Sequence, residues 1–445
     1  MNPQDTLQRL VDNGPLYGVR VLELGSTASG PFCTRLLADF GAEVVKVEAK
    51  EGDPIRELGQ TINGKSLYAA SIARNKEAIS LDLRVPKGRA LLKSMISQFD
   101  VVVENFRPGT LEKWGLGYDE LRKLRPDLVM TRISGYGQTG PYSHKPGYGV
   151  IGEAMSGLRH LIGDADRPPS RVAVPLTDYI TALYAAMGTL MAVLTREKTG
   201  QGQCVDVSLL ESAFSFMEAH VPSFDKTGVV AMRSGPRLPN SAPNTLFPTA
   251  SGDFIHITAF ADGVFRRLAK VMGRPDLSND PRFINQAARN ENEDELESLI
   301  REWTITQNMT YLQTSLDNAN VPATRIFTMA DIFEDPHFKS REMLLRTPDD
   351  DLGEVTLAGI VPRMSLTPGH VRWSGHRIGQ DTRAVLCRIA GLSEAEIDAL
   401  ENEGVVSSDQ RAEQAPVPTK LDNQQKVKES VAGGGGVIKL TPCIK

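Results

Sequence analysis

A single carboxylate, Asp178, lies within a long apolar stretch, VAVPLTDYITALYAAMGTLMAVL, over residues 172–194. A carboxylate among apolar neighbours is poorly solvated and is held in one direction, as a covalent nucleophile must be. Asp178 also follows Thr177 at the start of a predicted helix, where Asp is a favoured N-cap residue. Taken alone, the pattern leaves both interpretations open, a nucleophile and a helix cap.

A glycine-bounded turn, Gly25–Gly30, is the second feature that suggests chemistry. It lacks the G-x-G-x-x-G spacing of dinucleotide sites, because Ala28 and Ser29 stand where the backbone would need room near a pyrophosphate. A P-loop is excluded as well, since Pro31 and Phe32 replace its Gly-Lys-Ser/Thr end. The following helix start still offers free N–H groups to an anion, and a simple tight turn explains the pattern equally well.

Alternating strands and helices must position these residues. Val19–Leu24 and Glu43–Glu48 are predicted as buried strands, and the residues between Pro31 and Gly41 as a helix. The pattern then repeats, with predicted strands at Ala78–Leu83, Val101–Phe106, Leu128–Ser134 and from Cys204, and helices at Lys87–Gln98 and Tyr179–Arg196. Such β-α-β units predict an α/β fold built on a parallel sheet.

Changes in composition along the chain predict its domain organisation. The periodicity fails around residues 224–243, where Gly, Pro, Ser and Arg accumulate as in a linker or an active-site loop. We therefore predict the N-terminal part of a large domain over 1–224, a small domain over 225–327 and a return to the large domain over 328–406. The polar, Gln-rich residues 407–445 are predicted to be disordered.

The composition is that of a globular protein rather than a nucleic-acid-binding or secreted one. The 445 residues carry a formal net charge of −5 with both signs interspersed, which gives no basic surface for nucleic acid. The four cysteines are far apart, so we expect no disulfide framework or structural metal site and a reducing compartment. No apolar signal region or membrane span is expected. The predicted location is cytoplasmic, with an organelle as the alternative.

The motifs together resemble the class III CoA-transferases, the family of formyl-CoA transferase and carnitine CoA-transferase. The similarity extends from Gly18 to about Val406, and its motifs appear in the family's order. They are GVRVLELGSTASGPFCTRLLADFGAEVVKVE, RNKEAISLDL, VVVENFRPGTLEKWGLGYDEL, SGYGQTGPY and DYITALYAAMGTLMAVLTREKTGQGQCVDVSLLESA.

This resemblance implies the fold, the assembly and the site residues. It implies a Rossmann-like large domain formed by both chain ends, a smaller α+β domain, and an interlocked homodimer in which each chain threads through the other. It implies that Asp178 is the nucleophile and that coenzyme A, a substrate rather than a resident cofactor, contacts a set of residues along the first half of the chain. This set is Thr27, Ala28, Asn75, Lys76, Asn105, Phe106 and Lys113. The alternative for Lys76 and Lys113 is a solvated surface charge.

The implied activity is CoA transfer from an acyl-CoA to a free carboxylic acid, without a metal. The Asp178 carboxylate attacks the thioester to give a mixed anhydride and CoA thiolate, and the thiolate then forms an aspartyl-CoA thioester. An incoming acid reverses these steps. The glycine run that covers the formyl-CoA transferase site is absent, since residues 232–244 contain only Gly235. Arg233 and Arg237 in this segment are instead candidates to meet the second carboxylate of a dicarboxylic acid such as succinate.

Two other functions are compatible with the same resemblance. An α-methylacyl-CoA racemase needs a Gly-His-Asp motif, but Gly147-Tyr148-Gly149 stands in its place and His144 precedes the expected position. Without that base, two-sided proton transfer has no partner. A non-catalytic CoA-binding protein on the same fold is the second alternative. Retention of Asp178 argues against it.

Overall fold

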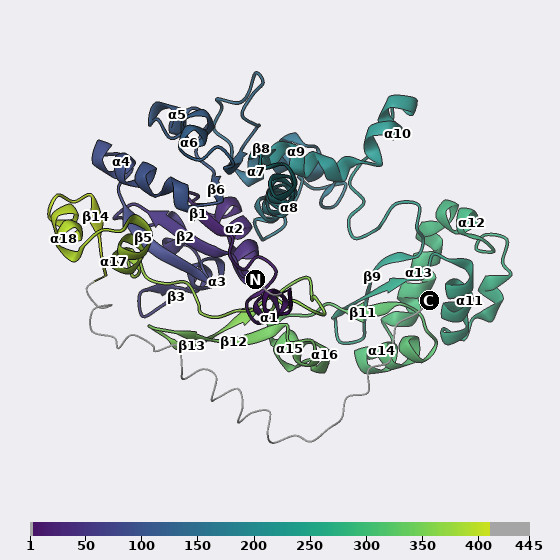
Figure 1. Ribbon diagram of the computed structural model, residues 1–445. Helices are drawn as coiled ribbons and strands as arrows, with labels where there is room; N and C mark the ends of the chain where they lie inside the picture. The colour runs from purple at the N-terminus through teal and green to yellow at the C-terminus, as the bar shows by residue number, and fades with distance from the viewer. Residues whose placement is uncertain (1–2, 410–445) are drawn as a thin grey trace.

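The computed structural model describes residues 3–409, and a seven-stranded sheet forms its centre (Figure 1). The strand order is β14-β5-β2-β1-β6-β7-β8, and all neighbours are parallel except β14, which pairs antiparallel with β5. The strands are β1 (Arg20–Glu23), β2 (Glu43–Glu48), β5 (Lys76–Leu81), β6 (Val101–Glu104), β7 (Val129–Ser134), β8 (Cys204–Ser208) and β14 (Val406–Ser407). The predicted mixed α/β fold with a large parallel sheet is confirmed, and residues near both ends of the described chain contribute strands to it.

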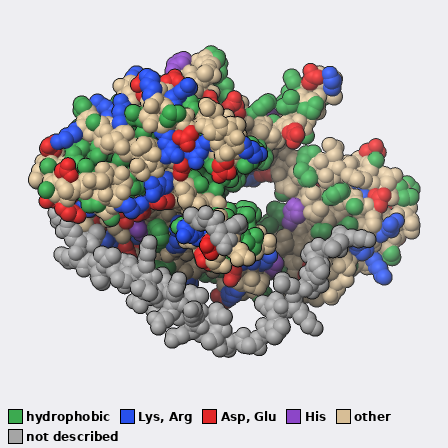
Figure 2. Space-filling model, in the orientation of Figure 1, with side chains coloured by type: hydrophobic (Ala, Val, Ile, Leu, Met, Phe, Trp, Pro, Cys, Tyr) green, Lys and Arg blue, Asp and Glu red, His purple; other side chains and the backbone are tan. Residues whose placement is uncertain are grey.

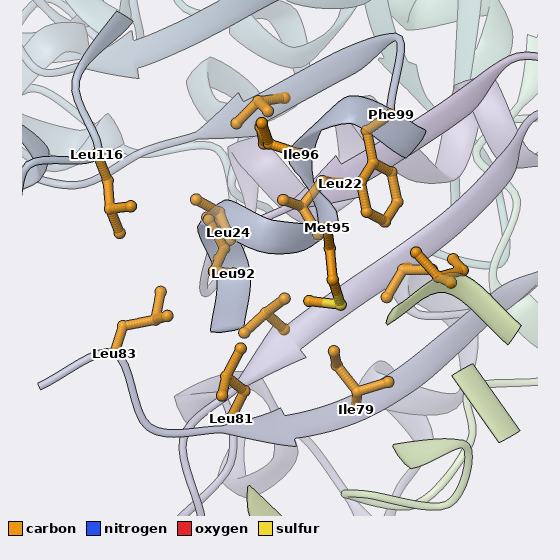
Figure 3. Close-up of a cluster of buried hydrophobic side chains, with 14 of the residues drawn as sticks. Leu22, Leu24, Ile79, Leu81, Leu83, Leu92, Met95, Ile96, Phe99 and Leu116 are labelled. Atoms are coloured by element: carbon orange, nitrogen blue, oxygen red, sulfur yellow. The ribbon is translucent and has the colours of Figure 1, made fainter. Parts of the chain in front are cut away.

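Helices cover both faces of this sheet, because its inner strands are apolar on both sides. One face packs against α2 (Ser29–Asp39) and α8 (Leu176–Thr199), where small residues such as Ala182 and Ala185 allow close approach. The other face packs against α4 (Pro86–Met95), α5 (Thr110–Lys113), α6 (Tyr118–Leu124), α17 (Thr382–Val385) and α18 (Glu394–Asn402). Figure 3 shows this second layer, in which Leu22 and Ile79 of the sheet meet Met95 and Phe99.

A second, smaller sheet has a core of its own. It is antiparallel in the order β11-β10-β9, with β9 (Asn244–Pro248), β10 (Phe254–Thr258) and β11 (Ala323–Arg325). Around it lie α11 (Asp262–Val271), α12 (Gln286–Glu291), α13 (Glu293–Thr304) and α14 (Met309–Asn318). Phe247, Phe265 and Phe283 are fully buried in this core, which shares no residue with the cores of the large sheet.

Two stretches of chain connect the two sheets. The outgoing stretch contains α9 (Leu209–Phe214) and α10 (His220–Thr227), and the return contains α15 (Met329–Glu334), α16 (Pro336–Ser340) and the hairpin β12 (Leu344–Asp349)–β13 (Gly353–Ala358). The predicted domain boundaries stay predictions, although the first falls inside α10 rather than in a loop. Of the predicted disordered tail, Ser407 lies in β14, and residues 410–445 are outside the described residues.

Helix α8 is longer and more apolar on its outer side than the sequence pattern predicted. Within residues 3–409 it alone has the length and the mean hydropathy, 1.2, that a membrane span would need, which a core helix can also have. One face packs on α2 and β7. The opposite face leaves five large apolar side chains 41–58% exposed, namely Leu183, Met187, Leu190, Met191 and Leu194.

Five further elements complete the part of the chain that holds the large sheet. They are α1 (Pro3–Asn13), β3 (Thr61–Ile62), β4 (Lys65–Ser66), α3 (Leu67–Ile72) and α7 (Gly149–Met155). Of these, α7 packs against α8 and α9 and therefore belongs to the surroundings of Asp178.

Candidate active site

A cavity of about 200 Å³ opens at the carboxyl ends of β1, β6 and β7. In open parallel sheets ligands bind in this position, outside the carboxyl ends of the strands. The loops that follow these strands supply much of the lining, and the beginning of α8 supplies the rest. The residues that matter chemically are Ser26–Ser29, Asn105–Arg107, Lys145, Tyr148 and Asp178.

Asp178 belongs to the first turn of α8 rather than to its cap. The helix begins at Leu176, its N-cap residue is Pro175, and no side chain caps it. The helix-cap interpretation of Asp178 is therefore wrong. The helix starts three residues earlier than predicted because the polar pair Thr177-Asp178 continues into the helix instead of ending the loop before it.

The Asp178 carboxylate is partly buried, and no cation of the described chain lies in hydrogen-bond contact with it. Among residues 3–409, no other residue donates a hydrogen bond to it. Burial raises its pKa to about 6, although its own backbone N–H and the charge of Arg171 act in the opposite direction. At neutral pH the group is thus ionised but weakly stabilised, which is the state a carboxylate nucleophile needs.

A glycine provides the space in which this carboxylate lies. Gly149 begins α7, and a Cβ atom placed on it would overlap Asp178 Oδ2. Next to Asp178, the Tyr179 hydroxyl lies 3.0 Å from that of Tyr68, and its ring packs on Phe32 with centroids 4.6 Å apart. These contacts hold the first turn of α8 against α2 and α3.

The first turn, Gly25–Gly30, brings a helix start to the same cavity. Thr27 has a positive φ of 67°, which is unusual for a β-branched residue. Ala28 is the N-cap residue of α2 and makes no side-chain capping bond, so N–H groups of the first turn remain available to an anionic group. Ser26 to Ser29 line the cavity that contains Asp178.

The structure brings four of the predicted CoA contacts together with Asp178. Thr27, Ala28, Asn105 and Phe106 all line its cavity. The polar atoms of Asn105 are occupied by the backbone of Ser26, so this residue offers a ligand its surface rather than free hydrogen-bonding groups. Lys113 ends α5 at the surface and lies outside this cavity, and its CoA contact stays a prediction.

Asn75 and Lys76 are not brought to the cavity. The Lys76 side chain is 1% exposed, and its Nζ donates to Glu23 Oε2 at 2.7 Å and to the Pro31 carbonyl at 2.6 Å. Asn75 is also buried and donates to Asp39 Oδ1 and to the His370 carbonyl. Since both side chains are enclosed and have protein partners, we assign neither of them a contact with CoA.

Two cations in the cavity were not predicted from the sequence. Lys145 and Arg107 line it, and neither has a carboxylate within ion-pair distance among the described residues. The Lys145 ammonium lies 3.6 Å from the centroid of the Tyr142 ring. Their positions in the loops after β7 and β6 could have indicated these two residues in the sequence, because the carboxyl ends of parallel strands converge.

The two arginines proposed for dicarboxylate recognition have other partners. Arg237 donates to Glu297 at 2.6 Å and to Asp294 at 2.7 Å, both on α13. Arg233 donates to the backbone carbonyls of His160 and Asp164. Neither side chain lines the cavity of Asp178.

A second cavity of about 210 Å³ lies on the other side of the first turn. It is at the ends of β1, β2 and β5, and it shares Ser26 and Phe106 with the cavity of Asp178. Trp114 and Arg84 line it, and its wall is mainly apolar. The two cavities are therefore neighbours with two wall residues in common.

Comparison with known proteins assigns this architecture to one family. The family model for "CoA-transferase family III" matches residues 16–382. Succinyl-CoA–D-citramalate CoA-transferase of Chloroflexus aurantiacus is 47% identical over 394 residues, 88% of this chain and 98% of that protein. The succinyl-CoA–L-malate CoA-transferase beta subunit of the same organism is 37% identical over 397 residues, with the same coverage of both chains. A CaiB/BaiF family protein from Brucella suis has a similar structure, with a TM-score of 0.77 at 32% identity over 85% of this chain and 100% of that one.

Proposed function

The chain belongs to CoA-transferase family III, and from this membership we propose that it moves CoA from succinyl-CoA to a small dicarboxylic acid, with Asp178 as the covalent nucleophile. The general activity, CoA transfer from an acyl-CoA to a free carboxylic acid, is that of its relatives. The observation that carries the assignment of Asp178 is its unpaired carboxylate in a cavity at the carboxyl ends of the parallel strands.

The first step is attack of an Asp178 carboxylate oxygen on the thioester carbonyl. The C–S bond breaks, the electron pair leaves with the CoA thiolate, and a mixed anhydride remains. The free N–H groups at the start of α2 are suitable donors for the oxyanion that forms on the way, because they line the same cavity. The thiolate then attacks the aspartyl carbonyl, which gives aspartyl-CoA thioester and the donor acid.

The acceptor acid completes the exchange through the same steps in reverse. Its carboxylate attacks the aspartyl thioester, the thiolate leaves, and the thiolate then takes the acyl group of the new anhydride. Every intermediate has Asp178 as its acyl carrier, so one desolvated carboxylate is sufficient and no second catalytic base is required. Water must be excluded while the anhydride exists, because hydrolysis would waste the thioester.

The two cavities offer a consistent place for the acyl-CoA. The acyl end lies beside Asp178, and the nucleotide end enters the apolar cavity beside Trp114. The phosphates would meet Lys145 and Arg107, whose charges have no carboxylate partner among the described residues. Lys113, exposed next to Trp114, is a further phosphate contact in this arrangement.

The acceptor is inferred from the relatives and from the charges that remain available. Citramalate and malate, which name the acceptors of two relatives, are both dicarboxylic acids. Because Arg237 forms ion pairs with Glu297 and Asp294, we do not propose that it binds the second carboxylate of the acceptor acid. Transfer rates with mono- and dicarboxylic acids of equal chain length test this choice, and equal kcat/KM values would contradict it.

Racemisation is disfavoured by the composition of the cavity. Two-sided proton transfer at an α-carbon needs a base on each face. Within the described part of the chain no histidine lines the cavity of Asp178, and Tyr148 and Gly149 stand where the racemase motif would place its base. Solvent deuterium should therefore not enter the α-carbon of a branched acyl-CoA.

The decisive experiment is acid-quenched peptide mass spectrometry after incubation with succinyl-CoA. We expect a CoA or succinyl adduct on the peptide that contains Asp178, and neither adduct nor turnover in Asp178→Asn. Asp166→Asn is the matched control, because Asp166 is an exposed carboxylate in the loop before α8. An adduct on a different peptide, or full turnover by Asp178→Asn, would contradict the assignment.

We also propose that the enzyme is an interlocked homodimer. Figure 2 shows an opening between the part that holds the large sheet and the part that holds the small one. Helix α10 extends beside it with no buried residue and with Val221 and Phe224 about half exposed. The exposed apolar face of α8 is a second surface that a partner chain would cover. Threading of one chain through the opening of the other would bury both surfaces.

A further inference from the structure

The turn Gly25–Gly30 separates the two proposed halves of the acyl-CoA site. Ser26 lines both cavities, and Thr27 adopts its positive φ of 67° between them. A β-branched residue in this conformation persists only where surrounding contacts hold it. The contacts that hold it come from buried polar side chains on neighbouring strands and loops.

Asp53 holds the middle of the turn. Its Oδ1 atom accepts hydrogen bonds from the Thr27 N–H at 2.8 Å and from the Ile55 N–H at 3.0 Å. Its Oδ2 atom forms an ion pair with Lys46 Nζ at 2.8 Å. The carboxylate is 5% exposed, so both interactions are shielded from water.

Lys46 holds the beginning of the turn. Its side chain is 1% exposed, and its three donors are all used, by Asp53 Oδ2, by Glu23 Oε1 at 2.8 Å and by the Gly25 carbonyl at 2.9 Å. Lys46 therefore connects the end of β1, the turn and the loop after β2. A lysine enclosed in this way has no donor left for a substrate phosphate.

Asn105 holds Ser26 from the opposite side. Its Oδ1 atom accepts from the Ser26 N–H at 2.8 Å, and its Nδ2 donates to the Ser26 carbonyl at 2.9 Å. The N–H and the carbonyl of Ser26 are thus both hydrogen-bonded to one partner, as the backbone groups of a residue are in a β-sheet. Both ends of the Ser26-Thr27 peptide unit are consequently fixed by side chains from outside the turn.

A tight turn does not need such a network to form. Buried ion pairs contribute little net stability compared with apolar packing of similar volume, and removing one partner leaves an unpaired charge. Their concentration around one turn is explained if the position of that turn matters for the reaction. We propose that Asp53, Lys46 and Asn105 are positioning residues that hold Ser26 and Thr27 in register with Asp178 and the bound acyl-CoA.

This inference rests on the proposed function, since the turn is taken to contact the acyl-CoA. Asp53→Ala removes the acceptor for the Thr27 N–H, whereas Asp53→Asn retains an oxygen at that position. Asp349 is the matched control: it is also 5% exposed, accepts two backbone N–H groups at 2.9 Å and pairs with Lys65 at 2.7 Å, but it lines neither cavity. Asp349→Ala should therefore lose stability in the same way without moving the turn.

The measurements are the affinity for free CoA by titration calorimetry and the rate of adduct formation from succinyl-CoA. We expect Asp53→Ala to lose about 10- to 100-fold in each, because small displacements at a reacting centre have effects of this size. Asp53→Asn should recover part of the loss. Folded Asp349→Ala should remain within twofold of the unchanged enzyme in both measurements.

Several outcomes would overturn the proposal. It is wrong if folded Asp53→Ala binds CoA and forms the adduct as the unchanged enzyme does, or if Asp349→Ala loses as much. Should Asp53→Ala fail to fold, Asn105→Ala removes two hydrogen bonds to Ser26 and no buried charge. Because Asn105 also lines the cavity, its test is the rate of adduct formation at saturating succinyl-CoA, where we expect a loss of about 10- to 100-fold that a lost binding contact alone would not cause. CoA affinity does not depend on the nucleophile, so full activity of Asp178→Asn would reject the proposed nucleophile and leave this test intact.

Discussion

At the scale of single residues, the chemistry depends on the protonation state of Asp178. Burial raises its pKa to about 6, and only the ionised carboxylate can attack a thioester. The rate of adduct formation should therefore fall as the pH is lowered through about 6, with the slope of a single proton. Single-turnover mass spectrometry between pH 5 and pH 8 measures this, with CoA affinity at each pH as the control. A rate that stays constant down to pH 4.5 would contradict the prediction.

The same pKa shift predicts a gain in stability when the charge is removed. The folded-state pKa, about 6, lies above the ordinary value of 3.8, so between these values the folded state binds more protons than the unfolded one. Stability from this group is present at low pH and is lost as the pH rises towards 6 and beyond. For a fully buried group, a pKa shift of this size changes the free energy of unfolding by about 3 kcal/mol. Partial exposure of Asp178 reduces this change to about 1 to 2 kcal/mol.

Asp178→Asn should accordingly be more stable than the unchanged protein at pH 7 to 8, and the difference should vanish below about pH 4. Denaturant unfolding at the two pH values measures this difference. The exposed Asp166→Asn should show no comparable gain. Equal stabilities of Asp178→Asn and the unchanged protein at pH 8 would show that the carboxylate is better solvated than the structure indicates.

The position of a site residue could be predicted from the sequence only where the residue directly follows a strand of the parallel sheet. The turn Thr27–Ala28 and the pair Asn105-Phe106 follow strands of one parallel sheet, so their convergence on Asp178 follows from the fold. The CoA contact of Lys76 came from the family resemblance, and the burial of this side chain in β5 could not be predicted from the sequence. Its partner Glu23 is 53 residues away in the chain, and no local pattern indicates such a pair.

At the scale of elements, the loop between β7 and α7 closes on itself through two glycines, Gly135 and Gly147, that line the cavity. A Cβ atom on Gly147 would lie 2.7 Å from the Gly135 Cα, and one on Gly135 would lie 2.8 Å from the Gly147 Cα. Both residues line the cavity of Asp178. Backbone atoms cannot yield to such a contact as a flexible side chain can, so any larger residue must separate the two ends of this loop.

Gly147→Ala should therefore lower both stability and transfer activity. Overpacking of this kind typically costs about 1 to 3 kcal/mol, and the displaced loop also carries Lys145 and Tyr148 of the cavity. Thermal unfolding and kcat/KM for succinyl-CoA are the measurements. Gly263→Ala in α11 is the control, because its new Cβ would meet nothing closer than 3.9 Å and should leave both values unchanged or slightly raise stability. An unaffected Gly147→Ala would mean that the two ends of the loop separate without consequence.

Helices and strands could be predicted where the period of the apolar residues agrees with the Gly and Pro residues that mark the ends of the element. The strand β2 and the helix α2 were expected from Glu43–Glu48 and from the stretch between Pro31 and Gly41, and the structure places them there within a few residues. The first predicted domain boundary, by contrast, falls inside α10. This helix has only eight residues, with Pro222 near its start, so its sequence is too short to show a helical period.

At the scale of the whole molecule, the exposed apolar face of α8 is the strongest sign that one chain is incomplete. Leu183, Met187, Leu190, Met191 and Leu194 recur at helical spacing on one side and are 41–58% exposed. A monomer seldom exposes a continuous apolar surface of this kind without a partner. The opening seen in Figure 2 gives a second chain a path, and threading would cover the extended α10 at the same time.

The exposed apolar face of α8 predicts a dimer. Light scattering should give about twice the chain mass of 48.6 kDa, and isotopically labelled dimers should not exchange subunits unless they unfold. The double variant Met191→Lys, Leu194→Lys should abolish the dimer, because two charges would be buried without partners. Leu124→Lys, at a residue 48% exposed on α6, is the control and should remain dimeric. A native monomer, or a dimer that exchanges freely, would reject threading.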